Sequence, residues 1–174
     1  MLMTSNITTS QTIGPFSHEA WRWACDATAD VNSPAPTITL SGIIRDGDGA
    51  PINDAMLEAW LPDGAAFEKA HALPGFRRCA SGEDGGFSFE LSQPLAPLAG
   101  QPAAWITVFA RGLGKHQFTA VFLEDDAALA QSAILNQVPL ERRATLVARK
   151  LADASYEWDV WMQTDKETVF FDYT

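Results

Sequence analysis

The chain lacks the features that mark several large classes of protein. Two cysteines among 174 residues, Cys25 and Cys79, are too few for a disulfide framework and are typical of reduced thiols in a cytoplasm. No apolar run approaches the roughly 20 residues of a membrane-spanning helix, and Met1 to Pro15 carries no secretory signal. Twelve lysines and arginines against 22 acidic residues give a net charge of −10, which argues against a nucleic-acid-binding protein. We therefore expect a cytoplasmic protein without a membrane or nucleic-acid partner.

The usual catalytic signatures are also missing. The sequence contains no Gly-x-Ser-x-Gly, no phosphate-binding loop and no Cys-x-x-Cys. Its three histidines, His18, His71 and His116, stand far apart, so no two of them have the close spacing of a metal-binding pair. A composite site built from distant strands remains open. Only two tyrosines occur, Tyr156 and Tyr173, both late in the chain. These absences favour a scaffold or a subunit over a self-sufficient catalyst.

The residues that are present favour short β-strands. From Thr37 onward, polar and apolar residues alternate, so that Ile38, Leu40 and Ile44 share one face of a predicted strand. Similar segments follow, separated by turn signals such as Asp46–Gly49. Many short strands at regular spacing predict an all-β fold, and we expect an antiparallel β-sandwich.

One short helix is expected near 125–136, because acidic residues precede a run of helix formers and Pro139 follows it. Residues 1–36 are predicted to form an extended N-terminal arm, in which Trp21 and Trp23 could tuck a short helical turn onto the core. Residues 37–174 are predicted to form the β-sandwich domain.

Five segments together resemble one family, the alpha chains of the protocatechuate 3,4-dioxygenases, which are intradiol ring-cleavage dioxygenases. In chain order they are Ser10–Pro15, Phe109–Gly112, Phe122–Asp126, Leu140–Leu146 and Glu167–Asp172. The resemblance covers nearly the whole chain and is weakest between Ser17 and Pro36. The last segment is distinctive of the alpha chains, whereas the Ser-Gln-Thr-x-Gly-Pro arm is shared by both chain types.

The resemblance implies β-sandwich subunits in an alpha/beta hetero-oligomer whose ferric iron is held by the beta chain. Two tyrosines and a His-x-His pair on a strand bind that iron. The matching strand here offers Ala103 and Trp105, and no tyrosine precedes Tyr156. The resemblance therefore implies that this chain holds no metal and no catalytic residue. With a protocatechuate 3,4-dioxygenase beta chain as partner, the assembly would cleave 3,4-dihydroxybenzoate with O2 to 3-carboxy-cis,cis-muconate.

The resemblance also assigns substrate-binding residues to this chain. In the family, the alpha-chain arm and one arginine at a strand end line the cleft of the beta chain. Carried over, these residues are Thr12, Gly14, Pro15, Phe16 and Arg111. The family commonly has tyrosine where Phe16 stands. Without the resemblance, Arg111 would be read as a surface cation and the arm as a disordered terminus.

Two other functions are compatible with the residues. The chain could be a stand-alone β-sandwich binding module without a catalytic partner. It could also be a homo-oligomeric intradiol enzyme with relocated metal ligands.

Overall fold

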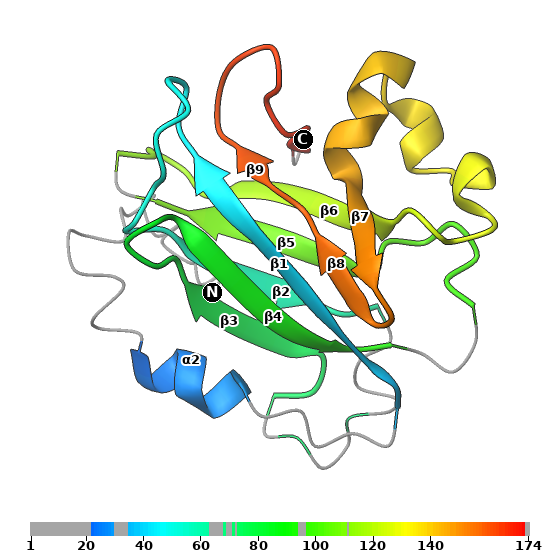
Figure 1. The fold of residues 1–174 in the computed structure, drawn as a ribbon, viewed down its shortest axis with the longest axis horizontal. Helices are drawn as coiled ribbons and strands as arrows, with labels where there is room; N and C mark the ends of the chain where they lie inside the picture. Colours follow the sequence, from blue (N-terminus) through cyan, green and yellow to red (C-terminus); the bar gives the residue numbers. More distant parts are fainter. Residues whose placement is uncertain are drawn as a thin grey trace, which may run out of the picture.

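β-Strands supply most of the regular structure in the computed structural model of the chain, which describes residues 22–29, 35–62, 68, 71, 73–93, 97–110 and 112–172 (Figure 1). In chain order the strands are β1 Thr37–Arg45, β2 Met56–Trp60, β3 Phe76–Ala80, β4 Gly86–Ser92, β5 Ala104–Phe109, β6 Gln117–Leu123, β7 Val147–Ala152, β8 Ser155–Glu157 and β9 Val160–Trp161. One α-helix, α2 Arg22–Ala29, precedes them. The expected mostly-β architecture is therefore confirmed.

The strands form one hydrogen-bonded path in the order β3-β2-β5-β6-β7-β8-β1-β4, with β9 also paired to β1. In Figure 1, β4, β1 and β8 cross in front of β2, β5 and β6, so the path folds back on itself. Three pairings are parallel, namely β1 with β8, β1 with β9, and β6 with β7. The prediction of an antiparallel sandwich therefore needs correction. Alternation along a strand shows which side chains face inward, but it carries no information about the direction of the neighbouring strand.

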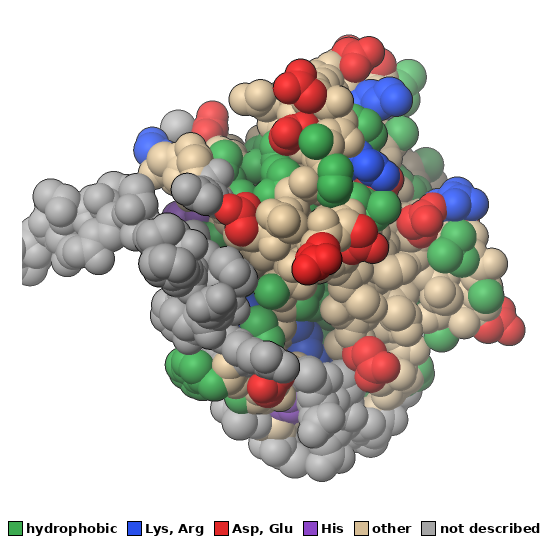
Figure 2. All heavy atoms as spheres, turned by 60° about the vertical axis from the view of Figure 1, so that its left-hand side comes forward, with side chains coloured by type: hydrophobic (Ala, Val, Ile, Leu, Met, Phe, Trp, Pro, Cys, Tyr) green, Lys and Arg blue, Asp and Glu red, His purple; other side chains and the backbone are tan. Residues whose placement is uncertain are grey.

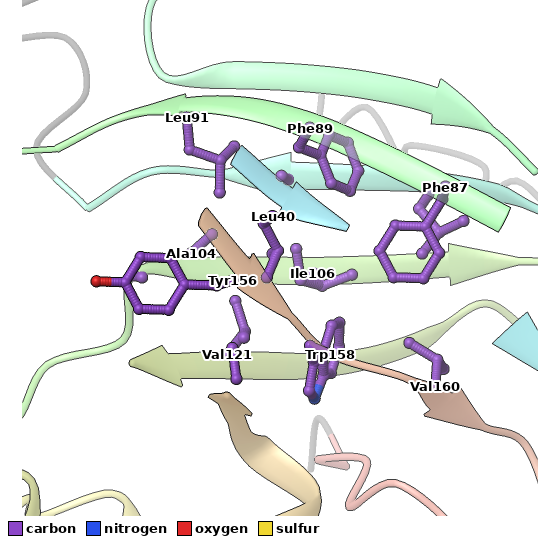
Figure 3. Close-up of a cluster of buried hydrophobic side chains, with 14 of the residues drawn as sticks. Leu40, Phe87, Phe89, Leu91, Ala104, Ile106, Val121, Tyr156, Trp158 and Val160 are labelled. Carbon is purple, nitrogen blue, oxygen red and sulfur yellow. The ribbon is translucent and has the colours of Figure 1, made fainter. Parts of the chain in front are cut away.

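The main core lies between the two halves of this folded path. Figure 3 shows Leu40 and Phe89 from one half facing Ile106 and Val121 from the other, with the indole of Trp158 among them. Leu40, Ile106 and Val121 are completely buried. The residues on either side of Val121, Ala120 and Phe122, are also completely buried, because they belong to a second hydrophobic cluster on the opposite face of the sheet. Acidic side chains are spread over the face drawn in Figure 2, in keeping with a solvated acidic surface.

The predicted helix near 125–136 is wrong. Short 3-10 turns stand there instead, η1 Leu129–Gln131 and η2 Leu135–Gln137, and a third, η3 Leu140–Leu146, follows. The Asp126 carboxylate does not serve a helix dipole but accepts hydrogen bonds from the Gly100 and Ala128 N–H groups at 2.6 and 3.0 Å. Buried Ser132 then accepts from the Leu135 N–H group at 3.3 Å. Such side-chain acceptors favour turns over a continuous helix.

A helix does occur within residues 1–36. The Thr28 hydroxyl of α2 accepts a hydrogen bond from the Arg78 N–H group of β3 at 2.9 Å, so the helix docks on that strand. Trp23, however, is 67% exposed, which contradicts the expectation that its ring enters the core. Trp21 lies outside the described residues. No helix in the described part of the chain combines the length and apolarity needed to cross a membrane.

Arg77 links the two ends of the strand path. From β3 its Nε–H donates to the Glu90 carbonyl of β4 at 3.1 Å, and its guanidinium pairs with the Glu68 carboxylate. Glu68 also accepts the Gly75 N–H group at 2.7 Å. The Arg77 and Glu68 side chains are 2% and 1% exposed. A single buried ion pair thus joins β3, β4 and the segment before β3.

Gly42 is required where β1 passes the backbone of Trp158. A Cβ at this position would lie 1.8 Å from the Trp158 carbonyl oxygen, so alanine forces the main chain to move. We expect Gly42→Ala to lower the free energy of unfolding by about 1–3 kcal/mol. Gly114→Ala is the matched control, because no heavy atom of the described residues lies within 4 Å of its Cβ position. Equal urea midpoints for the two variants would contradict this close approach.

Candidate functional site

The five residues predicted to bind substrate, Thr12, Gly14, Pro15, Phe16 and Arg111, all lie outside the described residues. The structure therefore neither brings them together nor separates them. It does describe the end of β5, where the Leu113 N–H group donates to the Ala110 carbonyl at 3.2 Å. Within this turn, Gly112 has a φ of 85°, a conformation that favours glycine.

Ala103, directly before β5, and Trp105 within it stand where the resemblance places a His-x-His pair. Ala103 is 2% exposed, and its N–H group donates to the Val121 carbonyl at 2.8 Å. The Trp105 ring stacks on Phe118 with centroids 5.2 Å apart and an interplanar angle of 8°. Neither side chain offers an imidazole or a carboxylate, so this strand end has no donor for a ferric ion.

Trp105 belongs to an aromatic row that crosses the outer face of the sheet. The register sets Phe76 opposite Trp60, and Trp60 opposite Trp105. Phe118 and Phe171 continue the row, with Phe171 edge-on to Trp105 at 6.1 Å. A pocket of about 500 Å³ lies beside Trp105, Phe118 and Phe171. Aromatic side chains therefore occupy this face of β2, β5 and β6.

The C-terminal segment forms one side of this pocket and is held by the neighbouring backbone. The Phe171 N–H group donates to the Phe118 carbonyl at 2.7 Å, and the Thr119 hydroxyl donates to the Val169 carbonyl at 2.7 Å. Arg142 of η3 donates to the Glu167 carbonyl at 2.8 Å. Two of the segments that carry the resemblance, Leu140–Leu146 and Glu167–Asp172, thus bind each other.

Tyr156 is the one tyrosine among the described residues, and it is committed elsewhere. Its hydroxyl donates to the Asp125 carboxylate at 3.0 Å, while Lys150 binds the same carboxylate at 2.9 Å. The hydrogen bond from Lys150 lowers the pKa of Asp125. Burial, together with the hydrogen bond to Asp125, raises the pKa of Tyr156. The phenol is therefore engaged in a hydrogen bond with Asp125.

The described residues do not fit a ferric ion. His71 binds the Leu73 carbonyl through Nδ1, and His116 lies against the Phe109 ring. Within the described ranges, no three His, Cys, Asp or Glu side chains gather in a way that could hold a metal.

Solved structures with the same fold include ring-cleaving dioxygenases. The dioxygenase domain of a carbohydrate-binding fusion protein from Streptomyces sp. SirexAA-E superposes with a TM-score of 0.57 at 18% identity, covering 80% of this chain and 85% of that one. Hydroxyquinol 1,2-dioxygenase from Pseudomonas putida DLL-E4 gives 0.55 at 18% identity, over 91% and 67%. No protein-family model matches the sequence.

Relatives found by sequence similarity give a narrower family assignment than the solved structures do. The protocatechuate 3,4-dioxygenase alpha chain of Burkholderia cepacia is 36% identical over 190 residues, which span 95% of this chain and 96% of that protein. The alpha chain of Pseudomonas putida is 31% identical over the same shares. The Burkholderia cepacia beta chain is 23% identical over 87% of this chain and 73% of its own length. The chain belongs to the family of protocatechuate 3,4-dioxygenase alpha chains, which are subunits of an oxidoreductase.

Proposed function

We propose that this chain is the subunit of a protocatechuate 3,4-dioxygenase that binds no iron and completes the active site of an iron-bearing beta chain. The assembly cleaves 3,4-dihydroxybenzoate between its two hydroxylated carbons and inserts both atoms of O2. The observation that carries the proposal is the pair Ala103 and Trp105, which replaces metal-binding imidazoles in a chain otherwise alike to alpha chains along 95% of its length.

The contribution of this chain to the site comes from the arm, residues 1–36, and from Arg111. Gly14 permits a close backbone approach to substrate, and Pro15 stiffens the segment. Arg111 supplies a permanent positive charge beside the substrate carboxylate. Large exposed apolar side chains, including Trp23, Trp60 and Leu140, add contact area for the partner.

Iron content and association test the proposal together. Expressed alone, the chain should carry no stoichiometric iron and should be poorly soluble, because its apolar faces lack their partner. Co-expressed with a beta chain that bears the Tyr and His ligands, it should co-purify as an iron-loaded complex. The measurements are metal analysis and gel filtration.

Two results would contradict the proposal. An iron-loaded, coloured homo-oligomer would show that the metal ligands had been relocated within this chain. A monodisperse chain that ignores the beta chain would instead support a stand-alone binding module.

A further inference from the structure

The pocket beside Trp105 has the size and the walls of a small-molecule site. Its volume of about 500 Å³ falls in the range typical of ligand pockets. The rings of Trp105, Phe118 and Phe171 line it together with Val138 and Val169. It lies on the face of β5 opposite Ala104 and Ile106, which belong to the main core. The pocket is therefore separate from the main core, and its walls belong to a second hydrophobic cluster, which contains buried Val138 and against which Trp105, Val169 and Phe171 pack.

The walls are formed before any ligand arrives. Trp105 and Phe118 lie parallel, and Phe171 meets both edge-on, at 6.1 and 6.4 Å. Hydrogen bonds from the Phe171 N–H group and the Thr119 hydroxyl fix the C-terminal side, and the Val169 N–H group donates to the Thr145 hydroxyl at 3.2 Å. A ligand that enters such a pocket loses little free energy to ordering of the protein.

The polar groups at the pocket decide which charge it accepts. Among the described residues that line it, Gln137 and Asp172 are the polar side chains, and there is no lysine, arginine or histidine. Asp172 is exposed at the pocket and is the one charged side chain among the described lining residues, so its carboxylate disfavours an anion. Both side chains can accept a hydrogen bond from an N–H or O–H group.

We propose that the Trp105 pocket binds a flat, uncharged aromatic molecule with a hydrogen-bond donor, and that it discriminates against the same ring bearing a carboxylate. This selectivity is the reverse of that proposed for the arm and Arg111. The proposal does not require a metal or a catalytic partner.

Indole is a suitable probe, because it is flat and uncharged and has one N–H donor. Titration of the full chain, in whichever soluble form it takes, should show saturable binding with a dissociation constant on the order of 1 mM or tighter. The dissociation constant of indole-5-carboxylate should be at least about ten-fold higher than that of indole. Asp172→Asn should reduce this difference in affinity between the two probes.

Two variants place the binding in this pocket. Gln137→Trp places a large side chain at an exposed position of the lining, where it should fill the pocket and abolish binding of the probe. Gln131→Trp makes the same change at an exposed residue of η1 outside the lining and should bind indole as the wild type does. Equal binding by the two variants, absence of saturation, or a preference for the carboxylate would each overturn the proposal. Indole binding is measured independently of iron content and turnover. The pocket proposal can therefore fail while the proposed function stands, and the reverse also holds.

Discussion

Replacing Arg77 with leucine is expected to lower the free energy of unfolding by about 3–5 kcal/mol, because it leaves the Glu68 carboxylate buried without its partner. The same change removes the hydrogen bond to Glu90, so β3 and β4 lose the side chain that bridges them. Urea unfolding followed by circular dichroism measures the loss. Removing both charges, in Glu68→Leu/Arg77→Met, should restore part of it, because an apolar pair leaves no unpaired charge.

Arg149→Leu is the matched control for Arg77. Arg149 pairs with Glu157 on the surface, where the two side chains are 64% and 46% exposed, so its loss should cost about 0–1 kcal/mol. If both substitutions cost the same, burial of the Arg77–Glu68 pair does not determine its contribution.

The Arg77–Glu68 pair also predicts a pH dependence. Burial alone would raise the pKa of Glu68, but hydrogen bonds from Arg77 and from the Gly75 N–H group outweigh it, so the pKa lies below its ordinary value of 4.5. A carboxyl whose pKa is lower in the folded state stabilises the protein above the unfolded pKa, and this contribution fades as the pH falls. The stability advantage of wild type over the double variant should therefore shrink below about pH 4.5.

Substituting Arg111 in the assembled alpha/beta enzyme should raise the apparent KM for the substrate without changing the iron content of the enzyme. A charge-assisted hydrogen bond to a carboxylate, when desolvated, contributes roughly 1.5–3 kcal/mol. Arg111→Ala should therefore raise the apparent KM for 3,4-dihydroxybenzoate by about ten-fold or more. Arg111→Lys should recover part of the loss, because an ammonium group cannot reproduce the planar fork of a guanidinium. Steady-state oxygen uptake is the measurement.

Deletion of residues 1–15 tests the arm in the same assay. Turnover should fall while the β domain keeps its circular dichroism spectrum and its unfolding midpoint. If Arg111 is an ordinary surface cation, both of its substitutions will leave the kinetics within about two-fold of wild type. That result would remove Arg111 from the site and leave the subunit assignment intact.

The fold could be predicted from the sequence wherever the information is local. Alternation placed Leu40 and Ile44 on a buried face, and both are completely buried. The parallel partners of β1 were not predictable, because they lie more than a hundred positions away in the chain and leave no local pattern. The segment 125–136 misled for a related reason: its composition favours a helix, but Asp126 and Ser132 bind neighbouring backbone groups and keep it in separate turns.

For the candidate site, the sequence could predict only that metal-binding side chains are missing from the strand at 103–105. The residue types at Ala103 and Trp105 were enough to exclude imidazole ligands. The aromatic row was missed, although alternation along 104–109 puts Trp105 on the face opposite Ala104, and this signal could have revealed it. The Arg77–Glu68 pair gave no signal, because each residue alone resembles an ordinary surface charge.

The position of β1 has a consequence for how the protein is made. Leu40 in β1 pairs with Phe89 on one side and with Tyr156 on the other. A ribosome delivers the first partner soon after β1, but the second only when synthesis is nearly complete. Until then β1 presents an unpaired edge, the kind of surface on which nascent chains aggregate. Chains that terminate before Ser155 should therefore be the most dependent on chaperones, although they contain most of the core.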